Sequence, residues 1–445
     1  MNAQYSPLES IQRWIKNSIM IKLLTITILI LVLLIPTSMI ESIIDEREYL
    51  NSQAIDEVSN KWANEQQING PILSVPLLYE TTTKEGVQQW TEYFHILPEQ
   101  LNIDGLVNPE KLKRGIYEIV VYKSKLHVNG NFVLKTNFDH KNLKEVRVQD
   151  AFLTIGISDL RGIEDEIYLT WNEKKLKASP GSQIPNIISK GVTIELDNLE
   201  LADHESYSFN LDLNLQGSHT LSFVPIGSTT MVTVDSSWPS PSFNGQFLPD
   251  ERSVSDSGFV AQWKVLQLNR NFPQSWTGRP SNLHMDDTAF GVDLLLPLDD
   301  YQKSMRSVKY AIMTITLSFL VFFIVEILSK RKIHPFQYTL VGLSLSLFYI
   351  LLISISEHSN FNFAYLISAC AVTIMIFLYS ISVFKAKKTS FLLAFILAGI
   401  YGFLFVTLQM ADYALLMGSI GLTAILSCTM YFTRGINWYQ INKEN

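Results

Sequence analysis

Cysteine, charge and recognisable catalytic motifs are all scarce in this sequence. Two cysteines in 445 residues exclude a disulfide-framed secreted scaffold. Charged residues make up 17% of the chain and hydrophobic residues 47%, a composition that excludes intrinsic disorder. The chain has no G-x-S-x-G elbow, no His-Glu-x-x-His pair, no Gly-rich phosphate loop and no Cys-x-x-Cys. We therefore expect neither an enzyme nor a bound cofactor.

The charge that is present is unevenly distributed. Residues 41–308 contain 23 Lys plus Arg against 37 Asp plus Glu, a net charge of −14, and the other 177 residues carry +7. An acidic block of this size argues against binding to a phosphate backbone, so nucleic acid is set aside as a partner.

Six apolar runs predict transmembrane helices. The first, residues 23–40, has 18 residues without a charge, enough to cross about 30 Å of hydrocarbon. A cleaved signal peptide is the alternative, but Ile35 to Glu41 offers no small-residue cleavage site, which favours an uncleaved anchor. The later runs are 310–328, 336–355, 363–384, 391–410 and 413–432. The expected partner of these helices is the lipid bilayer.

The positions of Lys and Arg in the short loops predict the orientation. They cluster on one face of the predicted bundle, at Arg13, Lys16 and Lys22, at Lys330, Arg331 and Lys332, at Lys385, Lys387 and Lys388, and at Arg434. Because cytoplasmic loops are enriched in Lys and Arg, both termini are predicted to be cytoplasmic and residues 41–308 to lie outside. Lys303, Arg306 and Lys309 disagree, since they fall on the predicted outer side.

The block between the first and second spans has the pattern of a β-rich domain. Residues 207–215 and 259–265 alternate apolar and polar side chains, as half-buried antiparallel strands do. Asn129-Gly130 predicts a tight hairpin, and the segment from Lys84 to Gly86 predicts another. Further strands are expected at 117–122, 147–157, 166–171, 192–196, 230–234 and 290–296. This spacing predicts a large sandwich or two stacked sheets.

A helical stripe precedes these strands. Leu50, Ala54, Val58 and Trp62 recur every fourth residue, so this segment either prolongs the first span as a stalk or packs on the sheet. The predicted fold is a membrane protein with six transmembrane α-helices and a large β-rich, sandwich-like periplasmic domain inserted between the first and second spans. Its expected parts are a cytoplasmic segment 1–22, an anchor 23–40, the periplasmic domain 41–308 with an N-terminal helix, a five-helix bundle 309–433 and a cytoplasmic tail 434–445.

Three segments of the β-rich block are candidate sites. His284 with Asp286 and Asp287, and the run from Glu164 to Glu166, have oxygen and nitrogen atoms suited to a cation, but polar loops explain them more simply, so no metal is expected. The third segment either presents an exposed recognition ledge or forms a buried corner, which is favoured; its residues are Trp238, Pro239 and Phe243.

Polar residues beside the apolar runs are the other candidates, because polar groups are costly to bury in a membrane. Glu326 is expected to pair with Lys330, four residues later. His334, Gln337 and Tyr338 open the third span. Glu357 and His358 close it, at the same expected depth as Asp412. This outer rim either marks the span ends, which is favoured, or forms a proton-linked gate.

Short strings along the chain, in a fixed order, resemble the CreD family of inner-membrane proteins from about residue 20 to residue 440. The membrane part contributes Lys309-Tyr310-Ala311-Ile312, Phe322-Phe323 with Glu326, His334-Pro335 with Gln337-Tyr338, Leu340 to Leu345, Phe348-Tyr349 and Ser356-Glu357-His358. The exported part contributes Gly70-Pro71-Ile72-Leu73, Leu97-Pro98-Glu99, Gly115-Ile116-Tyr117, Asp159 to Ile163, Trp238-Pro239, Pro241-Ser242-Phe243, Phe247-Leu248-Pro249 and Ser257-Gly258-Phe259 with Gln262-Trp263.

The resemblance implies a bacterial inner-membrane protein tied to cell-envelope integrity and to the response to envelope and β-lactam stress, under a two-component sensor system. It implies no catalytic residues. The favoured hypothesis is a non-enzymatic envelope-integrity protein. A transporter or exporter of a small or lipidic solute stays open, and a hydrolase is a more distant alternative. Contacts with other envelope proteins or with a second copy also stay open.

Overall fold

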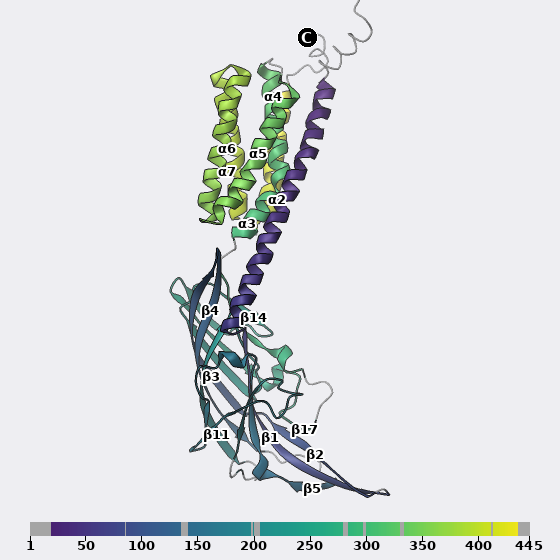
Figure 1. Ribbon diagram of the computed structural model, residues 1–445, viewed down its shortest axis with the longest axis vertical. Helices are drawn as coiled ribbons and strands as arrows, with labels where there is room; N and C mark the ends of the chain where they lie inside the picture. The colour runs from purple at the N-terminus through teal and green to yellow at the C-terminus, as the bar shows by residue number, and fades with distance from the viewer. Residues whose placement is uncertain are drawn as a thin grey trace, which may run out of the picture. The chain divides into compact units, whose positions relative to one another are not determined.

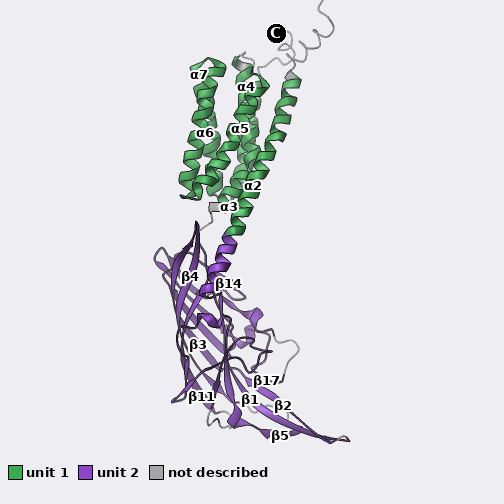
Figure 2. Cartoon of the chain, in the orientation of Figure 1, with its two compact units in different colours: residues 1–50, 298–445 green, residues 51–297 purple. Residues whose placement is uncertain are grey.

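The computed structural model describes two compact units, which are coloured separately in Figure 2. It describes residues 19–84, 86–134, 141–196, 199, 205–278, 284–296, 300–329, 333–410 and 413–434. A helical unit combines the chain up to Leu50 with the chain from Leu298 onward, and a β-rich unit covers Asn51–Pro297. The β-rich unit is shorter at both ends than the expected block 41–308, because the adjoining helices pack in the helical unit.

The helical unit consists of helices that contain all six predicted apolar runs. They are α2 (Ile19–Trp62, up to Leu50), α3 (Asp300–Lys309), α4 (Ala311–Ser329), α5 (Pro335–Ser356), α6 (Phe361–Phe384), α7 (Lys387–Gln409) and α8 (Ala414–Thr433) (Figure 1). In the described chain, four are long and apolar enough to cross a membrane, namely α2, α5, α6 and α7. The pair α3 and α4, bent by 44°, makes a fifth if it is one span, and the apolar stretch of α8 is shorter. The count of six spans therefore stays a prediction.

Helix α2 joins two segments that were predicted separately. It runs without interruption for 44 residues, with Pro36 inside it, so the stripe from Leu50 to Trp62 prolongs the first apolar run as one helix. Ala54 and Ser59 on this extension are buried. The structure is therefore compatible with both predicted alternatives. The stripe continues the helix, and part of it is buried.

The first helix belongs to the core of the helical unit. Leu33, Ile40 and Ile44 of α2 are buried in the same cluster as residues of α4 to α7. A Cβ atom at Gly342 of α5 would lie 2.3 Å from the side chain of Leu33 and 2.9 Å from that of Phe319. Glycine at this position lets α5 approach α2 and α4 closely.

The β-rich unit contains two sheets. The first has the order β14-β18-β12-β1-β6-β10-β9, with β2 and β5 also paired to β1 and β17 paired to β2. Its strands are β1 (Gln66–Thr83), β2 (Gly86–Ile96), β5 (Leu143–Val146), β6 (Phe152–Ile157), β9 (Ser179–Pro180), β10 (Gly191–Glu195), β12 (Thr220–Phe223), β14 (Pro241–Gly245), β17 (Ser275–Thr277) and β18 (Phe290–Leu294).

The second sheet has the order β15-β16-β13-β3-β4-β11-β7-β8. Its strands are β3 (Gln100–Arg114), β4 (Tyr117–Val133), β7 (Tyr168–Trp171), β8 (Lys174–Lys177), β11 (Ser206–Ser218), β13 (Thr229–Ser236), β15 (Glu251–Ser255) and β16 (Gly258–Leu266). β4 pairs with β3 and β11 along most of its length.

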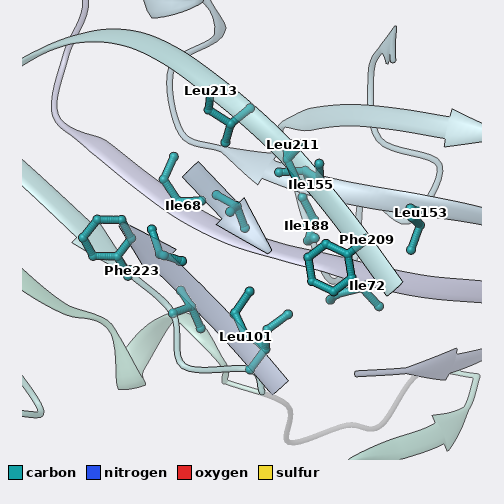
Figure 3. Packing of buried hydrophobic residues seen from close by; sticks show 14 of the residues in the cluster. Ile68, Ile72, Leu101, Leu153, Ile155, Ile188, Phe209, Leu211, Leu213 and Phe223 are labelled. Carbon is teal, nitrogen blue, oxygen red and sulfur yellow. The ribbon is translucent and has the colours of Figure 1, made fainter. Parts of the chain in front are cut away.

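Both sheets contribute to one hydrophobic core, as the alternating strands predicted. Figure 3 shows Ile72 and Ile155 from the first sheet beside Leu101 and Phe209 from the second. The alternating face of β11 supplies Phe209, Leu211, Leu213 and Leu215, all buried. The β-rich unit thus buries a core without disulfides.

One predicted turn is wrong and one is confirmed. Asn129-Gly130 lies inside β4, where Gly130 pairs with Leu101 on one side and Phe209 on the other. A Cβ atom at Gly130 would lie 2.0 Å from the carbonyl oxygen of Gln100 and 2.8 Å from the ring of Phe209, so close packing rather than a turn requires glycine. The hairpin after Lys84 is confirmed, because Thr83 of β1 pairs with Gly86 of β2.

Candidate functional site

Glu326 is a buried carboxylate in the helical unit. It lies on the apolar helix α4 with 4% of its surface exposed. Its Oε2 accepts a hydrogen bond of 2.8 Å from the hydroxyl of Tyr338, and its Oε1 accepts one of 2.7 Å from the backbone N–H of Ile333. The ammonium group of Lys22 on α2 forms an ion pair with the same carboxylate. A buried charge is tolerated only when it is paired and hydrogen-bonded, and Glu326 meets both conditions.

Tyr338 connects this carboxylate to the aromatic core. Its buried ring packs edge-on against Phe319 at 5.9 Å and Phe322 at 6.4 Å between ring centroids. Tyr338 therefore joins α4 and α5 by two different contacts. Its hydroxyl donates a hydrogen bond to the Glu326 carboxylate, and its ring fills space between the two helices.

His334 and Gln337 form the start of α5. The Nδ1 atom of His334 accepts a hydrogen bond of 3.2 Å from the N–H of Phe336, and the Oε1 atom of Gln337 accepts one of 2.9 Å from the N–H of His334. Pro335 occupies the first helical turn, where its missing N–H costs nothing. These two side chains cap the helix, and this capping brings Tyr338 to Glu326.

The structure gives Glu326 a cation that the sequence did not indicate. The sequence indicated Lys330, which lies outside the described residues; the described cation is Lys22, 304 positions earlier in the chain. Lys22 stands next to the first apolar run, so the sequence predicts that it lies near a membrane surface. The sequence does not predict its contact with α4, because that contact depends on how the helices pack.

A second ion pair lies at the other end of the same helices. The Nε atom of Arg47 on α2 is 3.0 Å from Oε1 of Glu357, whose side chain is 14% exposed, at the end of α5. His358 is a neighbour whose Nδ1 lies 3.3 Å from the carbonyl oxygen of Ser354. Asp412, the third residue of the predicted rim, lies outside the described residues.

The two ion pairs bracket the apolar part of α2. From Lys22 to Arg47 the helix advances 25 residues, about 37 Å at the rise of an α-helix. This is somewhat more than the roughly 30 Å of hydrocarbon in a bilayer. Each pair therefore fits near one end of the apolar layer, where α2 is held to α4 and to α5 respectively.

The Trp238 segment is a buried corner, the interpretation favoured from sequence. Trp238 is 6% exposed and its indole N–H donates to the carbonyl oxygen of Leu295 at 2.9 Å. Phe243 on β14 packs edge-on against Phe259 and Trp263 at 5.7 and 5.8 Å. Pro239 between them is exposed. The two aromatic side chains pack against the core, Trp238 buried and Phe243 partly buried.

The loops weighed as cation sites use their carboxylates in local contacts. Asp286 accepts hydrogen bonds from Gln67 at 3.0 Å and Asn69 at 3.2 Å, and burial raises its pKa. Glu164 accepts from Lys123 at 2.6 Å, and Glu166 pairs with Lys177 at 2.5 Å. Over the part of the chain that the structure describes, no group of three or more His, Cys, Asp or Glu residues is placed to hold a metal ion.

The Asp159 to Gly162 string holds the end of α2 within the β-rich unit. A hydrogen bond from the Arg161 guanidinium lowers the pKa of Asp159 to about 2. Asp159 also accepts from the N–H of Asn64 at 2.9 Å, and the Arg161 guanidinium donates to the carbonyl oxygen of Asn60 in the last turn of α2. A helix end leaves such carbonyl groups without partners, so this string acts as a cap. The sequence pattern did not indicate this capping role.

A buried Ser–His pair in the β-rich unit was also missed. The Oγ atom of Ser74 is 2.9 Å from Nδ1 of His95, which is 2% exposed and whose pKa burial lowers to about 4. His95 lines a cavity of about 550 Å³ together with Glu92, Tyr93 and Asn186. Ser74 does not line it and is fully buried, so the pair presents no accessible nucleophile.

Apolar helices with paired charges near their ends, together with a large β-rich unit, define a helical membrane protein with a large β-rich domain. Residues 18–439 match the family model described as "Inner membrane protein CreD". The chain is 34% identical over 419 residues to the inner membrane protein CreD of Escherichia coli (strain K12), covering 92% of this chain and 91% of the relative. The chain therefore belongs to the CreD family of inner membrane proteins.

A likeness to a solved structure is much weaker. The crystal structure of an M1 zinc metallopeptidase from Deinococcus radiodurans covers 38% of this chain and 38% of its own, with 10% identity and a TM-score of 0.18. A score this low carries no argument about fold or activity.

Proposed function

We propose that this protein supports the integrity of the bacterial cell envelope and tolerance of envelope and β-lactam stress, without enzymatic activity. Membership of an inner-membrane family that is not named for an enzyme supports the location and the class. The observation that carries the structural role is the pairing of Glu326 with Lys22 and of Glu357 with Arg47. Carboxylates held in this way stabilise helix packing.

The proposed topology has six spans, both termini in the cytoplasm and residues 41–308 in the periplasm. The Lys and Arg clusters of the short loops support it. Single-cysteine variants at Ser206 and Asn442, in a chain with Cys370 and Cys428 replaced by serine, test it with a membrane-impermeant thiol reagent. Labelling of intact cells at Ser206 alone is expected, and labelling at Asn442 alone would overturn the orientation.

The proposed partners are the lipid bilayer and, through the periplasmic domain, other envelope proteins or a second copy. In-cell crosslinking of the exported domain followed by partner identification tests this part. Crosslinks to envelope proteins or to another copy are expected. Recovery of the crosslinked chain as an uncomplexed monomer under every condition would count against it.

Transport of a small or lipidic solute is the competing function, and the rim residues separate the two. Glu357 forms an ion pair with Arg47 that joins the end of α5 to α2, a structural contact, whereas a gate would use the rim residues to pass protons. The double variant Glu357→Gln with Asp412→Asn keeps side-chain size while it removes charge. In a strain that lacks the protein, this variant should reach normal membrane abundance and restore survival under β-lactam stress, because Gln can still accept a hydrogen bond from Arg47, whose side chain is 39% exposed to solvent. Complete loss of tolerance at unchanged abundance would favour transport.

A further inference from the structure

Three cations on one short helix do not follow the rule that Lys and Arg are enriched in cytoplasmic loops, which predicts the orientation of the other loops. Lys303, Arg306 and Lys309 lie on α3, which is bent by 44° against α4 and buries its Ser304, Ser307 and Val308 face. The ammonium group of Lys303 lies 5.8 Å from the ring centroid of Phe361. In the described part of the chain, neither Arg306 nor Lys309 forms an ion pair with a carboxylate. A short amphipathic helix rich in cations is typical of a membrane interface.

A groove begins at Lys309 and continues along α4. Its first part is a cavity of about 450 Å³ lined by Lys309, Tyr310 and Met313 on one side and by Gly418 and Leu422 of α8 on the other. None of the described residues that line it is a carboxylate. Among these residues, the mouth of the groove therefore carries a positive charge and no negative one.

The second part of the groove is apolar. It shares Leu317 with the first part and has a volume of about 530 Å³ between α4, α7 and α8, with Ile324, Ile396 and Ile425 among its walls and Thr429 as its polar residue. From Ile312 to Val325 the groove follows α4 for about 20 Å. One leaflet of the hydrocarbon layer is about 15 Å deep, half of the bilayer core, so an acyl chain from that leaflet fits within the groove.

We propose that this α4–α8 groove binds an anionic phospholipid of the leaflet beside α3, with its phosphate at Lys309 and one acyl chain in the apolar part. An extended peptide would bring unpaired backbone N–H and C=O groups into an apolar groove, which an acyl chain does not. The positive charge of Lys309 at the mouth selects a lipid with net negative charge. The same contact accounts for the cations on α3 that the orientation rule leaves unexplained.

Native mass spectrometry of the full-length protein in a non-ionic detergent tests the headgroup part of the proposal. The probes are phosphatidylglycerol and phosphatidylethanolamine with identical acyl chains. Phosphatidylglycerol should be retained with a preference of about fivefold, and Lys309→Gln should remove most of that preference. Glycerol 3-phosphate, which has the charge without the chain, should not displace the lipid. Equal retention of both lipids, unchanged in Lys309→Gln, would overturn the proposal.

Filling the groove tests the acyl-chain part. A Cβ atom at Gly418 would meet no atom within 4 Å, so Gly418→Leu places a side chain in the groove without a backbone clash and should reduce retention of both lipids. Gly399→Leu on the exposed face of α7 is the matched control, since Gly399 has equal space and lines neither part of the groove. Ala424→Leu, in the apolar part, is a second filling variant. If both filling variants melt at the temperature of the control and retain as much lipid, the proposal is wrong.

Discussion

The helical unit and the β-rich unit place ion pairs in different environments. In the helical unit, the carboxylates of Glu326 and Glu357 are 4% and 14% exposed. In the β-rich unit, the pair of Lys177 with Glu166 leaves both side chains more than half exposed, at 57% and 60%. Water and salt screen exposed charges, whereas a charge that loses its partner in an apolar layer has no substitute. The same kind of contact therefore matters more for folding where the carboxylate is buried, as at Glu326 and Asp159, than where both side chains are exposed, as at Lys177 and Glu166.

Lys22→Met should give the largest effect, because it leaves the buried carboxylate of Glu326 without its cation. We expect a loss of about 3–5 kcal/mol in the free energy of unfolding, measured by denaturation of the purified protein in detergent micelles. Lys61→Met is the control, since its ion pair with Glu57 is exposed on α2. Adding Glu326→Leu to Lys22→Met should restore most of the stability. A double variant as unstable as the single one would contradict this account.

His95 should make the stability of the β-rich unit depend on pH. Burial lowers its pKa to about 4, against about 6.5 in an unfolded chain. Between these values the unfolded state binds a proton that the folded state does not, so stability falls by about 3 kcal/mol as the pH drops from about 6.5 to about 4. Unfolding curves of the full chain across this range should show the slope, and His95→Gln should remove it. The exposed His127→Gln is the control; a slope that survives in His95→Gln would exclude this residue as its source.

Asp159→Asn should have a smaller effect with a different pH range. The folded-state pKa of Asp159 is about 2, against about 3.9 in an unfolded chain. A lowered carboxyl pKa contributes stability that is fully present above pH 4 and disappears as the pH falls towards 2, so the variant should lose about 2 kcal/mol at neutral pH and nothing at pH 2. Asp165→Asn, which loses an exposed contact with Asn214, is the control. Equal unfolding midpoints for Asp159→Asn and its control at neutral pH would show that the cap on α2 is dispensable.

Lys177→Ala should have the smallest effect. Its ion pair with Glu166 lies on the surface of β8, where screening offsets the attraction. The unfolding midpoint should stay within experimental error of the parent at low and high salt. A clear loss of stability would remove the contrast between the two units.

Several helices of the helical unit were predictable almost to the residue, whereas α3 was not predicted and α2 extends well beyond the run 23–40. The apolar run 336–355 corresponds to α5 (Pro335–Ser356), because a backbone in hydrocarbon has to satisfy its hydrogen bonds within a helix. Strands such as β11 were predictable where one face is buried and the other is wet. β1 was missed as a strand because its middle is buried on both faces and shows no alternation. β3 was missed too, since Pro109 and several charges interrupt its pattern.

Only part of the candidate site could be predicted from the sequence. Glu326, His334, Gln337 and Tyr338 were selected because polar groups beside apolar runs are costly, and the structure joins Glu326 to Tyr338 and His334 to Gln337. The cations that neutralise the carboxylates, Lys22 and Arg47, were not identified as their partners.

Composition and periodicity alone determined that this chain has apolar helices, a β-rich block and no recognisable catalytic motif, because burial in lipid or in a sheet core constrains every residue of a segment. Tertiary structure alone decided which charges meet and which glycine a neighbour requires. Lys22 reaches Glu326 across 304 positions, and Gly130 makes room for Phe209 on the neighbouring strand. Such contacts depend on how whole elements pack against one another, and no local pattern in the sequence records that packing.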